Sequence, residues 1–128
     1  MRGPLSIYRG TGADLPFGDV LRAHPGVRME GYFWRFTAPG GDGRVLIALC
    51  GINQADEGSW STLGLAAHPN GFLRAIEYPE GRADRDRFGA FAGAAFAGTE
   101  ASLRVDLGPD ARLDVDVTQP VPWGRRAF

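Results

Sequence analysis

Short apolar segments separated by turn-forming residues recur along most of this chain, and this spacing constrains the fold more than any other feature. Apolar runs begin near positions 28, 44, 59, 72, 88, 101 and 113, and clusters such as Pro39–Gly43 and His68–Gly71 interrupt them. Strand-length segments spaced about 8–12 residues apart are typical of antiparallel β sandwiches and barrels. Only Val20–His24, followed by Pro25-Gly26, has the character of a helical turn. The sequence therefore predicts an all-β, antiparallel fold.

The clearest early element is a hairpin formed by residues 28–37 and 44–52. Alternation in the first segment places four side chains on one face: Glu30, Tyr32, Trp34 and Phe36. The intervening residues read Pro-Gly-Gly-Asp-Gly, and glycine allows the positive φ angles that tight turns need. The second segment is almost continuously apolar. We therefore expect two adjacent antiparallel strands here.

Five further regions complete the predicted architecture. Residues 59–67 and 72–78 are expected to be strands on either side of the turn at 68–71. The charged segment 80–87 predicts a solvated loop, whereas 88–99, rich in glycine, alanine and phenylalanine, fits either a bulged strand pair or a short helix. The last hairpin, 101–107 with 113–118, alternates apolar and polar residues. Arg104 is expected near Asp114 or Asp116 on its solvent face.

Length and composition narrow the class of protein. A chain of 128 residues that is 44% hydrophobic is sized for one domain, 1–128, with a filled core. The net charge is -1 and lysine is absent, which excludes a basic nucleic-acid surface, Schiff-base chemistry and a P-loop. One cysteine, Cys50, excludes an internal disulfide and, with only two histidines, argues against a metal site. We expect a cytoplasmic protein with no metal, cofactor, secretion signal or membrane span.

Glu30 is the strongest candidate for a catalytic residue in the sequence. It shares a strand face with Tyr32 and Trp34, and desolvation among aromatic rings favours a protonated carboxyl that can donate a proton at neutral pH. The alternative is that Glu30 pairs with an arginine near the end of its strand. Asn53 and Arg74 are polar residues in or beside apolar strands, and they either orient a ligand in a pocket or lie on an exposed face of the sheet.

Other reactive residue types have simpler structural interpretations. His24 and His68 each precede proline within a turn sequence, which favours a conformational role for both. Cys50 lies inside an apolar strand, where a thiol is usually a small buried hydrophobe with a raised pKa. Asp114 and Asp116 alternate with apolar residues and so belong to the solvent side of their strand.

One segment carries a family resemblance. The run Met29-Glu30-Gly31-Tyr32-Phe33-Trp34-Arg35-Phe36 resembles the strand that opens the barrel of the tocopherol cyclase family and related lipocalin-like isoprenoid enzymes. The apolar strand Val45–Ile52 and the tail Thr118–Phe128 look like the segments that follow in that family. The order of the aromatic residues differs, since Tyr32-Phe33 stands where Trp-Tyr is usual. Family members are generally much longer, so this chain would correspond to their N-terminal half.

The resemblance implies a lipocalin-like β barrel, or half of a larger barrel or sandwich, and a specific chemistry. It implies cyclisation or hydration of a prenyl double bond, in which an acid protonates the alkene and aromatic rings shield the carbocation. Glu30 would be the acid. Tyr32, Trp34 and Trp60 would line the pocket, and Asn53 or Arg74 would orient the polar head of the ligand.

These observations lead to one preferred function and two alternatives. The preferred function is binding of a hydrophobic, isoprenoid-like small molecule, with acid-promoted cyclisation as its sharper version. The alternatives are a non-catalytic lipocalin-type carrier, and a structural or assembly domain whose aromatic faces are simply core. A homodimer is left open, because a half-barrel has an unpaired edge that favours pairing.

Overall fold

The protein's structure is a computed structural model that describes residues 20–121. In this range the chain forms nine strands in two antiparallel sheets, and it contains no helix. Sheet A has the order β1-β2-β3-β4 and consists of β1 (Met29–Thr37), β2 (Val45–Ala55), β3 (Gly58–His68) and β4 (Phe72–Tyr78). Sheet B has the order β5-β6-β7-β8-β9 and consists of β5 (Arg82–Ala83), β6 (Gly89–Ala92), β7 (Phe96–Thr99), β8 (Ser102–Asp106) and β9 (Arg112–Asp116).

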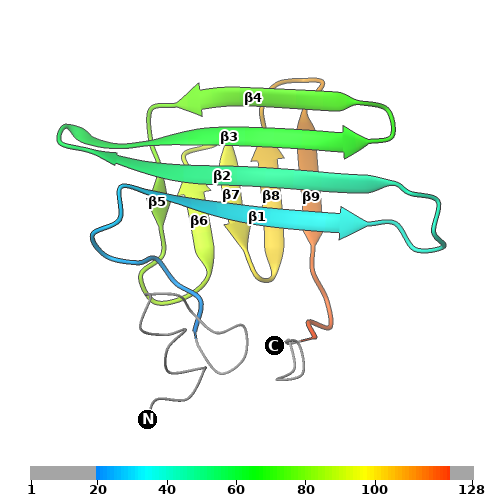
Figure 1. Cartoon of the computed structure of the whole chain (residues 1–128), viewed down its shortest axis with the longest axis horizontal. Helices are drawn as coiled ribbons and strands as arrows, with labels where there is room; N and C mark the ends of the chain where they lie inside the picture. The colour runs from blue at the N-terminus through cyan, green and yellow to red at the C-terminus, as the bar shows by residue number, and fades with distance from the viewer. Residues whose placement is uncertain (1–19, 122–128) are drawn as a thin grey trace, which may run out of the picture.

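The two sheets stack face to face with their strands running across each other. In Figure 1 the long strands of sheet A lie horizontally in front of the shorter, vertical strands of sheet B. This is the orthogonal way of packing two sheets. The chain passes from sheet A to sheet B between β4 and β5. The predicted all-β, antiparallel fold is confirmed, and the described strands remain two sheets that do not close into a barrel.

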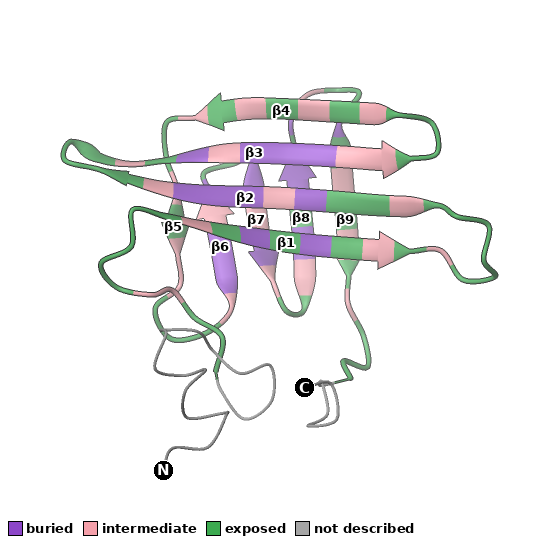
Figure 2. Ribbon diagram, in the orientation of Figure 1, coloured by how far each residue is buried: buried purple, intermediate pink, exposed green. Residues whose placement is uncertain are grey.

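The core lies where the two sheets overlap. Figure 2 shows buried segments in the middle of β1, β2 and β3 and along β6, β7 and β8, while the ends of the long strands are exposed. The largest fully buried side chains include Phe96, Leu63 and Leu103. Trp34 packs across β7, where an added Cβ on Gly98 would lie only 2.6 Å from the indole ring. Side chains of both sheets therefore fill the space between them.

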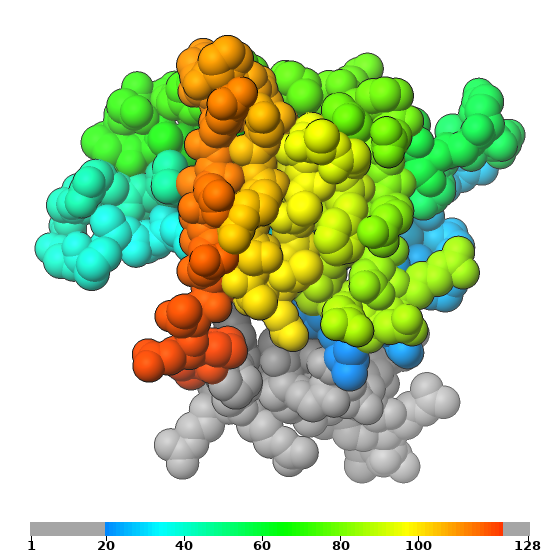
Figure 3. Space-filling model, turned by 180° about the vertical axis from the view of Figure 1, so that it is seen from behind, coloured from blue at the N-terminus to red at the C-terminus, as the bar shows by residue number. Residues whose placement is uncertain are grey.

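The outer faces of the two sheets differ in chemistry. The outer face of sheet B, seen from behind in Figure 3, carries ion pairs of Arg104 with Asp114 at 2.8 Å and with Asp116 at 2.7 Å, and of Arg112 with Asp106 at 3.2 Å. The predicted pairing of Arg104 across the last hairpin is thus confirmed. The outer face of sheet A instead exposes apolar side chains, including Phe33 and Leu73.

The structure corrects two local predictions and decides a third that the sequence left open. The expected helical turn at Val20–His24 is wrong, because the Ala23 amide donates to the Asp84 carbonyl at 2.8 Å instead of to its own segment. The segment expected to be a loop at 80–87 contains the short strand β5, which pairs with β6. The ambiguous segment 88–99 is the strand pair β6–β7. The hairpins β1–β2 and β8–β9 form as predicted.

Candidate functional site

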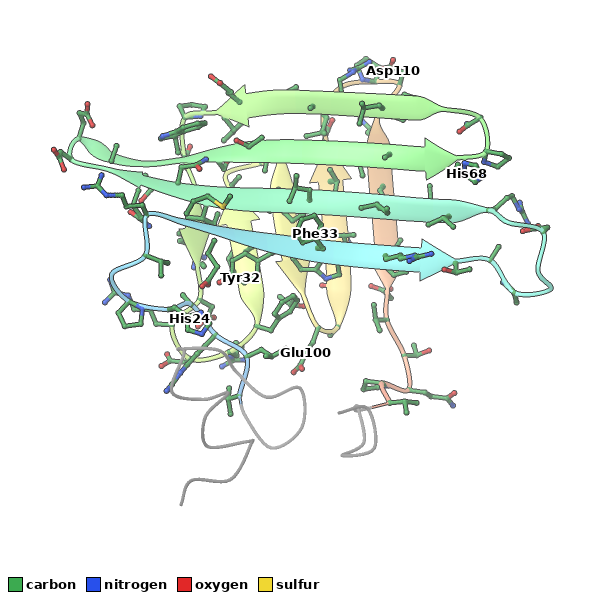
Figure 4. The ribbon with its side chains drawn as sticks, viewed as in Figure 1. His24, Tyr32, Phe33, His68, Glu100 and Asp110 are labelled. Carbon is green, nitrogen blue, oxygen red and sulfur yellow. The ribbon has the colours of Figure 1, made fainter. Side chains whose placement is uncertain are left out.

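A cluster of three polar side chains lies at the start of β1. Nδ1 of His24 lies 2.5 Å from Oε2 of Glu30, and the hydroxyl of Tyr32 donates a hydrogen bond to Oε1 of the same carboxylate. The backbone amide of His24 also points at Oε1, at 3.4 Å. Figure 4 shows His24 and Tyr32 near each other at this end of the sandwich. One carboxylate therefore joins an imidazole and a phenol.

The turn before β1 brings His24 to Glu30. Pro25 and Gly26 reverse the chain, and Gly26 has a φ of 80°, which glycine adopts without steric cost. Two backbone hydrogen bonds hold the segment on the sandwich. The Ala23 amide donates to the Asp84 carbonyl at 2.8 Å, and the Gln54 amide donates to the Arg28 carbonyl at 2.7 Å. The segment before β1 is thus tied to β2 and to the residue that follows β5.

The cluster borders a half-open cleft of about 1050 Å³. Its wall is formed by residues 22–28, the C-terminal end of β2, the N-terminal end of β3, and residues 81–85. Both His24 and Glu30 face it, whereas Tyr32 lies behind them at 5% exposure. Apolar lining comes from Pro25, Val27, Ile52, Ala55 and Ala83. This volume is just above the usual range for a small-molecule site, about 300–1,000 Å³.

The charged lining of the cleft favours an anionic group. It consists of the arginines Arg22, Arg28, Arg82 and Arg85 and the acids Glu30, Asp56 and Asp84. Arg82 stacks on the ring of Phe91 with its guanidinium carbon 4.3 Å from the ring centroid. Glu30 is engaged by His24 and Tyr32. The arginines therefore outnumber the acids that remain to pair with them, and guanidinium groups bind carboxylates and phosphates well.

The hydrogen bonds of Glu30 define what the cluster can do. The hydroxyl of Tyr32 donates to the carboxylate, and the tautomer of His24 sets whether Nδ1 donates to the carboxyl group or accepts from it. The arrangement can take up or release a proton at the cleft, with His24 and Tyr32 as reservoirs beside Glu30. The partner of Glu30 is a histidine, so the expected arginine pairing is wrong.

Two of the predicted pocket residues belong to the packed core. Tyr32 and Trp34 both contact Phe88, with ring centroids 5.6 and 5.2 Å apart, and Trp34 also contacts Phe96 at 5.5 Å. The indole Nε1 of Trp34 donates to the Thr99 carbonyl at 3.0 Å. Glu30, Tyr32 and Trp34 do share the inner face of β1, and of these three only Glu30 borders the cleft.

The other predicted residues lie elsewhere. Asn53 and Trp60 form a cross-strand pair on the outer face of sheet A, and Trp60 is 38% exposed. Arg74 donates to the Leu107 carbonyl at 3.2 Å and to the Asp110 carboxylate at 2.6 Å, so that it ties β4 to the β8–β9 turn. The structure does not bring these three residues to Glu30.

Cys50 lies in the core and takes no part in the cleft. Its side chain is fully buried, and this burial raises the pKa of the thiol to about 12. The predicted buried, unreactive thiol is confirmed.

Most of the cleft leaves no pattern in the sequence. The sequence indicates a turn at His24 without a partner for its imidazole, and it does not single out Arg28, Arg82 and Arg85. The available signal is the His24-Pro25-Gly26 turn, whose histidine precedes Glu30 by six residues, since the turn folds this histidine back onto the following strand. The arginines of 82–85 come from a distant segment, and only the packing of the two sheets brings them here.

Residues 20–121 contain neither a metal-binding cluster nor a membrane-spanning helix. No group of three or more His, Cys, Asp or Glu side chains is arranged to hold a metal ion there. No helix long and apolar enough to cross a membrane occurs in the same residues.

Comparisons with known proteins add no family. No protein-family model, curated protein or solved structure matches the chain significantly. The resemblance of residues 29–36 to tocopherol cyclases therefore stays a prediction.

Proposed function

We propose that this protein binds a hydrophobic, isoprenoid-like small molecule that carries an acidic head group, and that it does so in the cleft beside Glu30. The observation that carries the proposal is the pairing of an amphipathic cleft with a hydrogen-bonded His24–Glu30–Tyr32 cluster at its wall. The arginines fit the acidic head, and the apolar lining fits a hydrocarbon body.

The sharper version of this proposal is acid-promoted cyclisation of a prenylated phenol, the chemistry that the tocopherol cyclase resemblance implies. The Glu30 carboxyl gives its proton to the alkene, the phenolic oxygen of the ligand attacks the resulting carbocation, and the phenolic proton returns to the Glu30 carboxylate. The reaction is an isomerisation that needs no cofactor. Binding has more support than catalysis, because the rings of Tyr32 and Trp34 pack in the core and do not line the cleft.

We extend the proposal to the larger fold of which this sandwich is a part and to the cellular compartment of the protein. We propose that the open sandwich corresponds to the N-terminal half of a larger lipocalin-like assembly, as the resemblance implies. The single cysteine, Cys50, remains the argument for a cytoplasmic setting. The alternative of an assembly domain without a pocket is less favoured, because a cleft of ligand size is present.

Calorimetric titration with two probes tests the binding function. Farnesoic acid carries an isoprenoid tail and a carboxylate, and farnesol carries the same tail without charge. We expect farnesoic acid to bind more tightly, and Arg28→Gln to weaken it about tenfold. Arg44→Gln, in the distant β1–β2 turn, is the matched control and should bind like the unmodified protein. Equal binding of the two probes, or an equal effect of both variants, would refute the arginine-lined site.

A turnover assay separates the enzyme from the carrier. The substrate is a prenylated hydroquinone, and the product is its cyclic ether. If Glu30 transfers the proton, Glu30→Gln should lower the rate at least about 100-fold while binding persists. Glu57→Gln, an exposed carboxylate in the β2–β3 turn, is the matched control. Binding without turnover in the unmodified protein would assign the carrier function.

A further inference from the structure

The outer face of sheet A is an apolar surface that no described residue covers. Its exposed large side chains are Met29, Phe33, Ile47, Trp60 and Leu73, of which Phe33 is 64% and Leu73 is 73% exposed. Figure 4 shows Phe33 on this face, away from the sandwich interior. The outer face of sheet B is charged by comparison. Clustered apolar exposure on one face of a soluble domain marks an interaction surface.

The strand register orders this face into rows. One row runs Phe33, Leu49, Gly64, Ala75 across the four strands. The rows on either side run Arg35, Ile47, Ala66, Leu73 and Gly31, Gly51, Thr62, Glu77. The two charged residues, Arg35 and Glu77, therefore stand at diagonally opposite corners of an apolar patch. Neither forms an ion pair within residues 20–121.

Arg35 and Glu77 are separated by almost the same distance across the strands as along them. Arg35 on β1 and Glu77 on β4 are three strand spacings apart, which is about 14 Å. Their rows are four residues apart along the strands, which is about 13 Å. The line that joins them therefore crosses the strands at about 45°. A two-fold axis in the plane of the face and perpendicular to this line exchanges the two positions.

We propose that two copies of this chain dimerise by stacking the outer faces of sheet A crosswise about such a two-fold axis, so that Arg35 of each copy pairs with Glu77 of the other. An axis at about 45° to the strands makes the strands of the two sheets cross at about 90°, which is a favoured way to pack sheets. The contact is isologous and closes, as homodimer interfaces do.

The apolar residues of the patch fit the same axis. The ring of Phe33 leans over Gly31, where an added Cβ would lie 3.3 Å from it. The axis runs along the other diagonal of the patch, from Gly31 to Leu73, so it brings this ring against the Phe33 ring of the other copy. Leu73, at the opposite corner, likewise meets its own copy. The protruding side chains at both ends of the axis thus meet each other.

The area of the contact sets the expected affinity. Two four-stranded faces that cross overlap over about 19 Å by 19 Å. This buries on the order of 1,000 Å² in total, at the lower limit for a specific interface. We therefore expect a dissociation constant in the micromolar range, with the two ion pairs contributing orientation more than affinity.

Sedimentation velocity over a concentration series reaching about 100 µM tests the dimer. Arg35→Glu and Glu77→Arg each place like charges opposite one another, so each should raise the dissociation constant at least about tenfold. The double variant restores opposite charges and should recover the affinity to within about threefold. Glu57→Arg makes the same charge change outside the patch and should leave the dimer intact. Circular dichroism verifies that each variant is folded.

Each outcome of the sedimentation experiment either supports or overturns the proposed dimer. Dimerisation that is lost in both single variants and recovered in the double variant supports the crosswise interface, and it cannot come from unfolding. If the protein stays monomeric at the highest concentration, the proposal is overturned, and the apolar face must then be covered by something other than a second copy. A dimer that ignores both single charge reversals also overturns it, because the contact then uses another surface such as a free sheet edge.

Discussion

Replacing Gly98 by alanine should destabilise the protein mainly through a clash with the indole ring of Trp34. The added Cβ would lie 2.6 Å from Cζ2 and 2.7 Å from Cη2 of Trp34, and 3.1 Å from Cδ1 of Leu103. The indole ring is rigid and only 7% exposed, so it cannot yield by rotating into solvent. The ring must shift, which strains its packing and its hydrogen bond to the Thr99 carbonyl.

The magnitude follows from three contributions. Overpacking a core of this kind costs about 1–3 kcal/mol, and loss of the indole hydrogen bond costs about 1 kcal/mol. Replacing glycine by alanine in an extended strand returns about 0.5–1 kcal/mol through the unfolded state. Gly98→Ala should therefore lower the free energy of unfolding by about 1–3.5 kcal/mol. For a domain of this size that is a drop in Tm of about 4–14 °C.

Urea unfolding followed by circular dichroism measures this loss. Gly64→Ala is the matched control, because its added Cβ would meet its nearest neighbours at 3.7 Å, an ordinary contact. In a Trp34→Phe background the atoms Cζ2 and Cη2 are absent, so Gly98→Ala should then cost less than about 0.5 kcal/mol. An equal cost in both backgrounds would show that the clash with Trp34 is not the cause.

Two further predictions concern groups outside the cleft. Because burial raises the pKa of Cys50 from 9.0 to about 12, the unfolded chain loses the thiol proton first. The free energy of unfolding should therefore fall between these pH values by up to about 1.4 kcal/mol per unit, a slope that Cys50→Ala should reduce in alkaline urea titrations. Arg74→Met should cost about 0.5–1 kcal/mol, since the guanidinium is partly exposed. Its hydrogen bond holds the pKa of Asp110 below the ordinary value, so NMR titration should find that pKa raised in the variant.

The sequence predicts where the strands lie better than it predicts which face of each strand packs against the other sheet. Alternation in β1 correctly grouped Glu30, Tyr32 and Trp34 on one face, because side-chain period is a local property of a strand. Both faces of β1 are apolar, since Gly31 and Phe33 occupy the other. Periodicity therefore could not decide which face meets the second sheet.

The candidate site was predictable only in part. Glu30 was identified from its aromatic neighbours, but its contact with His24 depends on how the Pro25-Gly26 turn closes. Trp60 was grouped with Trp34 by residue type, although the β2–β3 register places Trp60 on the opposite face of sheet A. Contacts between distant segments follow from the stacking of the sheets, which no local pattern encodes.

The most direct test of the proposed function is an NMR titration of the ¹⁵N-labelled protein with farnesoic acid. The account predicts chemical-shift changes concentrated at the cleft, in residues 22–30, 52–56 and 81–85, and weaker binding in Arg28→Gln. It also predicts that the outer face of sheet A around Phe33 stays unchanged. No shift in the cleft, or shifts confined to the outer face of sheet A, would contradict it.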